Sequence, residues 1–308
     1  MLSSEHSKVE NELQALENEL RSKNRFFPQG TILSYIDKVS FMAKHTVPKG
    51  TKVYRCRLIS KAEEDRFLAP AVTPISDELM KCFPQAKDIR ECLNMLWAKG
   101  FVFDGQGWKK EEEALKKASE TAQDLVEKNA PFYGYDEKES DAPPVEKAKA
   151  GRINPEGIVY LYAAKDVQTA ILETRPVPTQ YVSVAEIEMM EDMNLFSFIN
   201  MPVFDDGKNS LTYVDYGAVG EYFSRPNYSD QSYYLATQYI SEYIKNMKSE
   251  DGNAVFDGMC FKSSLNPEGV NYVFFDTNKE TRKYKILNSA LYQVKDLMGN
   301  REQIFPWK

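Results

Sequence analysis

Turn signals divide the chain into short segments whose apolar spacing alternates between that of strands and that of helices. Residues 51–58 (TKVYRCRL) and 181–188 (YVSVAEIE) alternate apolar and polar side chains, as half-buried strands do. In all, five segments are predicted to be strands: residues 51–58, 157–164, 181–188, 255–261 and 270–276. Helical patterns lie between them without regular alternation, so we expect an α+β fold with a mixed or antiparallel sheet.

The segments outside the predicted strands are predicted to be helices or an ordered loop. Asp166 is placed to cap a short helix that ends at Thr174, directly after the strand 157–164. Residues 136–150, which contain paired prolines, are predicted to be an ordered loop or linker. The other helical patterns cover residues 4–22, 76–99, 109–129 and 233–247.

The N-terminal segment carries its own apolar stripe. Val9, Leu13, Leu16 and Leu20 recur at helical spacing, and a second apolar segment follows at residues 32–42. We expect two helices that pack on the main domain, with a stripe that binds a partner or a second copy as the alternative. The predicted domains are therefore a helical extension, residues 1–45, and a main domain, residues 46–308.

Composition excludes several classes of site. The cysteines lack a C-x-x-C pair, and the two histidines, His6 and His45, lie in the N-terminal fifth of the chain. A zinc site needs about four clustered nitrogen or sulfur ligands, so neither a metal site nor a histidine triad is expected.

The net charge of −7 argues against nucleic acid as a partner, because nucleic-acid binding surfaces concentrate positive charge. No apolar run reaches the roughly 18 residues of a membrane helix. The polar, acidic N-terminus also differs from a secretory signal. We therefore expect a cytoplasmic protein with no membrane partner.

Three arginines are candidates for binding a phosphate-bearing ligand. Arg55 and Arg57 stand two apart in a predicted strand, so both project from one face and could hold a pyrophosphate. Arg152 lies between Gly151 and the turn at Asn154-Pro155, which would hold its backbone. Taken singly, each is more often an ordinary surface arginine.

Glu173 is the candidate for the chemical step. It lies at the border of the apolar face of its short helix, where a carboxylate could stabilise the positive charge that develops on a ribose as a glycosidic bond breaks. Tyr162 could offer its ring to a base and its hydroxyl to a ligand. Ser263 and Ser264 follow a predicted strand, where hydroxyls can reach a cleft. A surface glutamate, a core tyrosine and turn serines are the ordinary alternatives.

The order of these motifs resembles the RES-domain family, which is named for its arginine, glutamate and serine. The resemblance extends over roughly residues 50–280 and rests on YRCR, GRINPEGIVYLYAAKDVQTAILE, YVSVAEI, YLATQYISEYI and DGMCFKSSLNPEGVNYVFF. It implies a fold similar to that of ADP-ribosyltransferases, with NAD bound in a cleft of the sheet. It assigns the family arginines to Arg55 and Arg152, the tyrosine to Tyr162, the glutamate to Glu173 and the serine to Ser263.

The resemblance also implies an activity. Members of the family act as toxins of toxin–antitoxin pairs that deplete NAD by hydrolysis or phosphorolysis, so we expect an NAD glycohydrolase or NAD phosphorylase that uses NAD as substrate and no metal. Glu173, Arg55 and Ser263 are the expected catalytic residues, and Arg55, Arg57, Arg152, Tyr162 and Ser263 are expected to bind NAD. The expected partners are NAD, inorganic phosphate, an antitoxin or inhibitor, and a second copy of the chain. A protein ADP-ribosyltransferase and a non-catalytic NAD-sensing module are the alternatives.

Overall fold

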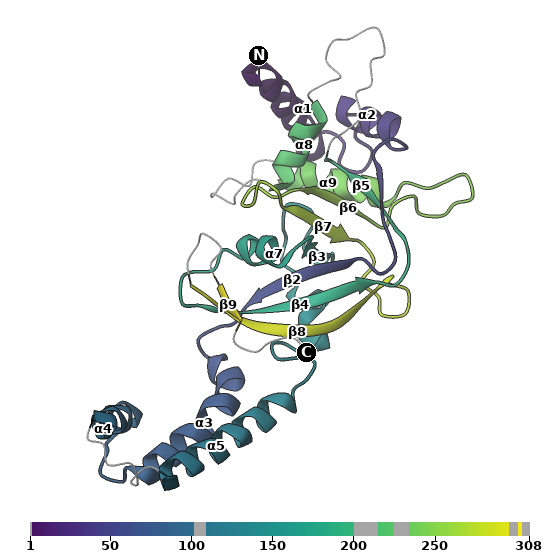
Figure 1. Ribbon diagram of the computed structural model, residues 1–308. Helices are drawn as coiled ribbons and strands as arrows, with labels where there is room; N and C mark the ends of the chain where they lie inside the picture. Colours follow the sequence, from purple (N-terminus) through teal and green to yellow (C-terminus); the bar gives the residue numbers. More distant parts are fainter. Residues whose placement is uncertain (1, 102–108, 200–214, 225–233, 296–300, 304–308) are drawn as a thin grey trace.

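The fold is taken from a computed structural model, which describes residues 2–101, 109–199, 215–224, 234–295 and 301–303 (Figure 1). These residues form one nine-stranded sheet in the order β1-β5-β6-β7-β3-β2-β4-β8-β9. Only β5 and β6 run parallel among the paired strands described, and the other neighbours are antiparallel. The predicted α+β class and mixed sheet are confirmed.

The sheet is made from strands spread over the whole chain. They are β1 (Lys44–Val47), β2 (Lys52–Leu58), β3 (Leu161–Ala164), β4 (Tyr181–Met189), β5 (Met193–Ser197), β6 (Gly258–Lys262), β7 (Val270–Phe274), β8 (Tyr284–Val294) and β9 (Arg301–Gln303).

The helices pack around the sheet or project from it. They are α1 (Leu2–Ser22), α2 (Thr31–Val39), α3 (Glu64–Cys82), α4 (Ile89–Phe101), α5 (Lys109–Glu127), α6 (Glu137–Ser140), α7 (Val167–Glu173), α8 (Asp215–Ser224), α9 (Tyr234–Lys245) and the 3₁₀ turn η1 (Val145–Lys147).

Two predictions of local structure are wrong in detail. The helix expected over residues 76–99 is interrupted after Cys82, because the next residue, Phe83, has a φ of −128° and a ψ of 68°, outside the helical region. Pro84 follows, and a residue before proline is pushed away from helical backbone. The loop expected over residues 136–150 contains α6, because Asp136 and Glu139 form a reciprocal capping box.

The centre of the sheet is split between β2 and β3. These strands form a single backbone pair, Tyr54 with Ala164, whereas β2 pairs with β4 along its whole length. The expected strand at 157–164 is also shorter than predicted, since Gly157 adopts a φ of +79° and β3 begins only at Leu161. Beyond this one pair the two strands diverge, which leaves room for side chains between them.

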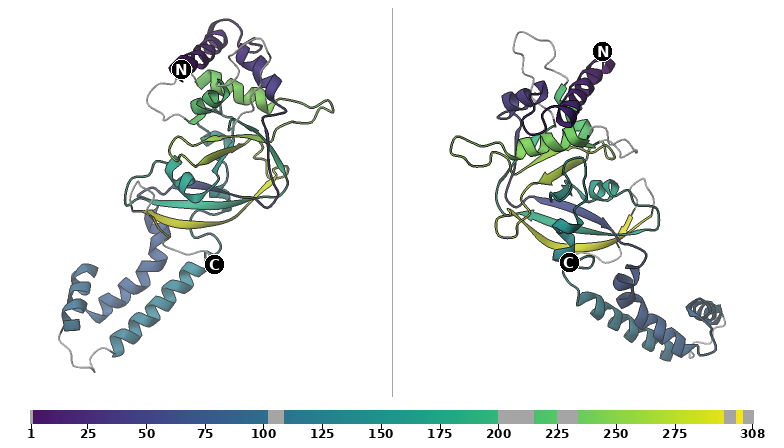
Figure 2. Two further views of the ribbon diagram at one scale, coloured as in Figure 1. Left: turned by 45° about the horizontal axis from the view of Figure 1, so that its top comes forward. Right: turned by 180° about the vertical axis from the view of Figure 1, so that it is seen from behind.

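The N-terminal helices share a core with the sheet. Leu13, Leu16 and Ile36 are fully buried in the same apolar cluster as Met259 and Val273, which lie on β6 and β7. Figures 1 and 2 show α1, α2, α8 and α9 gathered at this end of the sheet. The N-terminal segment is thus packed on the main domain, and β1 crosses the predicted domain boundary at residues 45 and 46.

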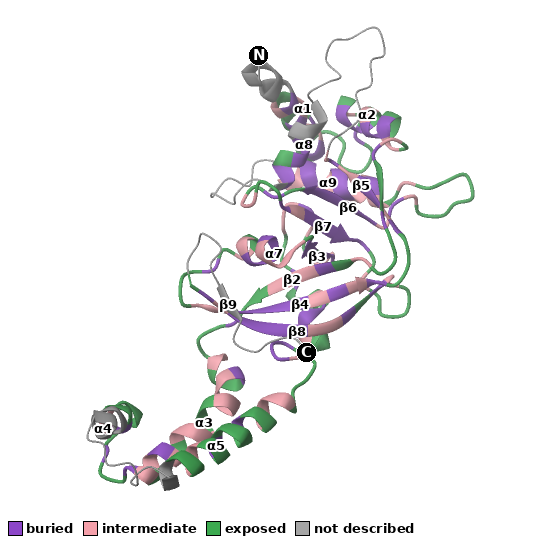
Figure 3. Cartoon of the chain, in the orientation of Figure 1, coloured by how far each residue is buried: buried purple, intermediate pink, exposed green. Residues whose placement is uncertain are grey.

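Helices α3, α4 and α5 form an arm that projects from the opposite end of the sheet (Figures 1 and 2). The arm has a small apolar cluster of its own, in which Leu79, Phe83 and Cys92 are buried and Leu115 packs against them. Most of its remaining surface is exposed or half-buried, whereas the strands of the sheet are largely buried (Figure 3).

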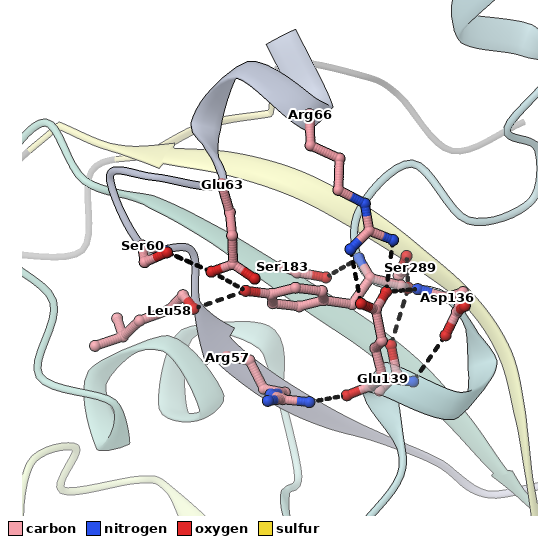
Figure 4. A network of polar contacts seen from close by, with 11 residues as sticks. Arg57, Leu58, Ser60, Glu63, Arg66, Asp136, Glu139, Ser183 and Ser289 are labelled. Carbon is pink, nitrogen blue, oxygen red and sulfur yellow. Dashed lines mark hydrogen bonds and ion pairs between the residues drawn. The ribbon is translucent and has the colours of Figure 1, made fainter.

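A polar network joins the base of the arm to the sheet (Figure 4). Arg66 makes a two-pronged contact of 2.7 and 2.8 Å with the carboxylate of Glu139. Tyr135 donates its hydroxyl hydrogen to Glu63 at 3.1 Å, and its backbone nitrogen donates to Ser183 of β4 at 2.9 Å. The first turn of α3 is therefore held against the segment that follows the arm.

Candidate functional site

A cavity of about 510 Å³ opens at the split between β2 and β3. Its walls come from β2, β3, α7, the loop before β3, α8 and the strands β6 and β7. The lining includes Tyr54, Arg55, Cys56, Gly151, Arg152, Asn154, Tyr162, Ala170, Glu173, Thr174, Arg175, Phe223, Phe261, Asn271 and Tyr272. The structure thus brings together four of the six predicted site residues: Arg55, Arg152, Tyr162 and Glu173.

Arg55 occupies the gap between the diverging strands. Its Nη1 donates to the backbone oxygen of Tyr162 at 2.9 Å, so the side chain bridges β2 and β3 where their backbones no longer pair. Its Nε is buried and has no hydrogen-bond partner among the described residues. This donor is available to a ligand that enters the gap.

The positive charge of Arg55 is not compensated within the described part of the protein, where no carboxylate forms an ion pair with it. Burial, and then the nearby charge of Arg57, lower the pKa of Arg55 to about 10. The guanidinium therefore stays protonated at neutral pH, and a half-buried cation without an ion pair favours an anionic ligand.

Glu173 ends α7 and is fixed by two side chains from the strands below it. Ser263 donates its hydroxyl hydrogen to Glu173 Oε1 at 2.6 Å, and Asn271 Nδ2 donates to the same oxygen at 2.8 Å. Asp166 caps the other end of α7, as predicted, by accepting from the backbone nitrogen of Thr169 at 2.8 Å. One carboxylate oxygen is thus fixed, while Glu173 as a whole remains exposed to the cavity.

Ser263 lies behind Glu173 and is not part of the cavity lining. It is 7% exposed, and its oxygen accepts from the backbone nitrogens of Leu265 and Asn266, both at 3.1 Å. The hydroxyl thus donates its hydrogen to Glu173 and accepts two hydrogen bonds from the turn, so its hydrogen-bonding capacity is filled. Its place in the structure is that of a support for the carboxylate.

Tyr162 faces the cavity from β3 and is held by the loop before it. Its hydroxyl donates to Asn154 Oδ1 at 2.6 Å, and the ring is 36% exposed. Asn154 is buried, and its Nδ2 donates to the backbone oxygens of Lys149 and Ile158, both at 3.0 Å. A Cβ at Gly151 would lie 2.9 Å from Asn154 Oδ1, so a larger residue would disturb this arrangement.

Arg152 is held by the helices at the other side of the cavity. Its Nη1 donates to the backbone oxygen of Tyr222 at 3.1 Å, and its guanidinium lies 5.6 Å from the ring centre of Tyr234. The hydroxyl of Thr237, in α9, donates to the backbone oxygen of Arg152 at 2.6 Å. Contacts with α8 and α9 thus hold both the side chain and the backbone of Arg152.

Arg57 is not brought to the cavity. It lies farther along β2, donates to the backbone oxygen of Glu139, and is 5.0 Å from the ring centre of Tyr135 (Figure 4). The two arginines share a strand face as expected, but Arg57 contacts the segment after the arm, whereas Arg55 lines the cavity.

Three further residues contribute to the site in ways that the sequence does not indicate, although Asn154 belongs to the predicted Asn154-Pro155 turn. Asn154 and Asn271 are buried amides that position Tyr162 and Glu173, and Arg175 lies at the cavity wall with a φ of +49°. The available signals were a polar residue inside the apolar strand VNYVFF and an arginine at the end of a helix, where glycine is common.

The described residues contain no group of three or more histidine, cysteine, aspartate or glutamate side chains placed to hold a metal ion. Among the same residues, no helix is both long enough and apolar enough to cross a membrane.

Comparison with known proteins matches residues 124–293 to the RES domain. The matched residues include β3, α7, β4 and β5 to β8, whereas β2, which carries Arg55, lies outside them. No curated protein and no solved structure matches the chain significantly. RES domains are associated in general with enzymes that act on NAD and with toxin-like proteins. Because the match covers more than half of its length, the chain belongs to the RES-domain family.

Proposed function

We propose that the cavity binds NAD and that the protein cleaves the bond between nicotinamide and ribose. The observation that carries the proposal is the presence of two charged groups of opposite sign, Arg55 and Glu173, in one cavity without an ion pair between them. NAD carries the complementary charges, a negative pyrophosphate and a positive nicotinamide ring. A ligand with these two charges would complement Arg55 and Glu173 at the same time.

The arginines supply the binding of the pyrophosphate in this proposal. Arg55 offers a buried Nε without a hydrogen-bond partner among the described residues. Arg152 offers its guanidinium, and the backbone of this residue is fixed by a hydrogen bond from α9. Hydrogen bonds to a charged group contribute about 1.5–3 kcal/mol each, so two arginines account for useful affinity without a phosphate-binding loop.

Glu173 acts on the ribose. As the glycosidic bond breaks, its electron pair goes to the ring nitrogen, neutral nicotinamide leaves, and the ribose carbon becomes an oxocarbenium ion. A carboxylate held in place stabilises this new charge without having to reorganise. Ser263 and Asn271 support that function by fixing Oε1, which leaves Oε2 toward the substrate.

Tyr162 provides an aromatic surface between these two regions. The hydroxyl is tied to Asn154, which fixes the ring, and the exposed part of the ring can pack on the nicotinamide or its ribose. Water or inorganic phosphate then attacks the anomeric carbon, which gives ADP-ribose and a proton or the corresponding ribosyl phosphate. In a cell this reaction would deplete NAD, which accords with a toxin controlled by an antitoxin or inhibitor.

The test is to incubate the purified protein with NAD and to measure free nicotinamide by chromatography. We expect release by the wild-type protein and strongly reduced release by Arg55→Ala. The matched control is Lys285→Ala, which removes an exposed cation of β8 that does not line the cavity. Equal rates for Arg55→Ala and Lys285→Ala would contradict the assignment of this cavity.

The same incubation separates the alternatives when the NAD is labelled in its adenine half. Label that stays on the protein would indicate a protein ADP-ribosyltransferase. NAD binding without any nicotinamide release would indicate a sensing module. Labelled ADP-ribose in solution indicates hydrolysis, and a product that forms only with added phosphate indicates phosphorolysis.

A further inference from the structure

A second cavity, of about 400 Å³, lies near β1 and the ends of β5 and β6. Lys44 and His45 contribute to its wall from β1, and Lys165 contributes from the end of β3. Ser197 and Tyr272 add hydroxyl-bearing side chains from β5 and β7. No aspartate or glutamate is part of this lining.

The basic residues of this cavity have no partners in the described part of the chain. The side chains of Lys44, His45 and Lys165 form neither an ion pair nor a hydrogen bond with another described residue, although acidic residues outnumber basic ones in the chain by 46 to 39. Two ammonium groups beside one concavity repel each other, and a bound anion would remove that repulsion.

Tyr272 adds a neutral donor to the same wall. It is 6% exposed, and its hydroxyl forms no hydrogen bond with another described residue. Burial raises the pKa of Tyr272 to about 12, so the phenol keeps its proton at neutral pH and can donate it. Basic residues and a phenol in the lining of one cavity suit a multiply charged oxyanion better than a single carboxylate.

We propose that this second cavity binds a small phosphate-bearing molecule. A phosphate monoester carries a charge of about −1.5 to −2 at neutral pH and three strong acceptor oxygens, which matches two lysines, an imidazole and a phenol. Met42, Ile199 and Val270 supply apolar wall for the organic part of the ligand.

This site is distinct from the cavity that contains Glu173. Glu173 and Asn271, which holds it, line the first cavity and are not part of the lining of the second. Tyr272 nevertheless contributes to the walls of both cavities. A binding experiment must therefore show which cavity the phosphate occupies.

The two histidines allow such an experiment. In histidine-labelled protein, the ring signals of His45 and His6 can be followed by NMR while inorganic phosphate replaces chloride at constant pH and ionic strength, with His45→Gln used for assignment. We expect the His45 signal to shift and to saturate, while the His6 signal stays in place. Absence of a saturating shift at His45 would overturn the proposal.

Variants locate the bound phosphate. Lys44→Gln combined with Lys165→Gln should weaken binding about tenfold or more, because two charge-assisted contacts are lost. Lys49→Gln combined with Lys285→Gln makes the same change in net charge at exposed residues outside both cavities and should leave the affinity unchanged. Arg152→Ala, in the first cavity, should also leave it unchanged. Binding that survives the first variant, or that is lost in Arg152→Ala, would show that the phosphate occupies another place.

Discussion

At the scale of single residues, the site depends on how one carboxylate is held. Glu173 uses Oε1 for two hydrogen bonds, to Ser263 and Asn271, and both come from segments about 90 residues farther along the chain. Such bonds lower the freedom of the side chain without neutralising its charge. The carboxylate can therefore be both fixed and reactive, which a glutamate on a free surface could not be.

The substitution Glu173→Gln tests whether this charge acts in the chemical step. Glutamine keeps the size and the hydrogen-bonding reach but not the charge, so we expect kcat for nicotinamide release to fall by roughly 10²–10³. The affinity for NAD should change little, because the missing interaction belongs to the transition state. Single-turnover kinetics and equilibrium binding measure the two quantities. Glu280→Gln, an exposed glutamate outside the cavity, is the control, and similar turnover in both variants would remove Glu173 from the mechanism.

Arg175 combines an unfavourable backbone with a place at the site. Its φ of +49° lies in the left-handed region, which costs a side-chain-bearing residue about 1–2 kcal/mol. Arg175→Gly should relieve this strain, offset in part by the greater freedom of glycine in the unfolded chain, for a net gain of up to about 1 kcal/mol. At the same time NAD binding should weaken, since a cation leaves the cavity wall.

Denaturant unfolding and NAD titration of Arg175→Gly check these two effects together. Arg175→Lys is the matched control, because it keeps both the strain and the charge. A loss of stability in Arg175→Gly would show that the backbone at this residue is not strained, and an unchanged affinity for NAD would show that the Arg175 side chain does not take part in binding.

The residues at the site differ in how far they could be predicted. Arg152 and Glu173 stand in local motifs, a turn and a capped helix, so their order in the chain was informative. Asn154 makes local contacts, with Lys149, Ile158 and Tyr162, but the sequence does not show which side chain its amide holds. The role of Asn271 comes from its contact with Glu173, which lies 98 residues earlier in the chain. Arg57 shares its strand face with Arg55, but its contact with Tyr135 could not be predicted from the spacing of two residues.

At the scale of elements, predictions held where one pattern acts alone. The strands β2 and β4 alternate clearly and α7 has a strong cap, so their positions were predicted within a residue or two. The strands β1, β5, β8 and β9 were not predicted. β5 is a short strand paired on both sides and has little alternation, and the identity of such a strand depends on its neighbours in space.

The contact between α1 and α9 also depends on a single buried carboxylate. Glu17 of α1 accepts from the backbone nitrogen of Ala236, in the first turn of α9, at 2.7 Å and pairs with Arg21 at 2.6 Å. Helix starts have unpaired backbone donors, and here a side chain from another helix satisfies one of them. Burial raises the pKa of Glu17 above its ordinary value of 4.5 and outweighs these bonds, which lower it.

This shift predicts how stability changes with pH. A carboxyl whose pKa is raised in the folded state contributes stability that is complete below its ordinary pKa of 4.5 and is lost as pH rises through the raised value. Glu17→Gln keeps an acceptor but cannot titrate. The free energy of unfolding of the wild type, minus that of Glu17→Gln, should therefore fall as pH rises from 4.5 and then become constant. Urea unfolding at several pH values measures this difference, and a rise with pH would mean that the bonds outweigh burial.

At the scale of the whole molecule, the RES match and the compact part of the fold do not coincide. The match begins at residue 124, within α5, yet β2 and the N-terminal helices belong to the same sheet and the same apolar core. The arm, in contrast, is inserted between β2 and the matched segment and has its own small cluster. The chain is thus a RES domain whose sheet is completed by the N-terminal segment, with an arm between β2 and the matched segment.

This division predicts that the arm can be shortened without loss of the fold. Leu115 packs near Leu79, so α3 and α5 can be cut at matching levels by removing residues 76–118 and joining the ends with about four glycine and serine residues, a usual length for a link between helices. The base of the arm would stay, including Phe67, which packs against Tyr135 and Leu291. We expect a folded protein whose nicotinamide release per folded molecule stays close to that of the full chain.

The contrasting variant is Leu13→Ala in α1, which removes a fully buried side chain from the shared core and should lower the free energy of unfolding by about 2–5 kcal/mol. Thermal unfolding and nicotinamide release of both variants check the prediction. If the shortened chain unfolds at lower temperature than Leu13→Ala, or folds but no longer releases nicotinamide, the arm is part of the catalytic unit and the division is wrong.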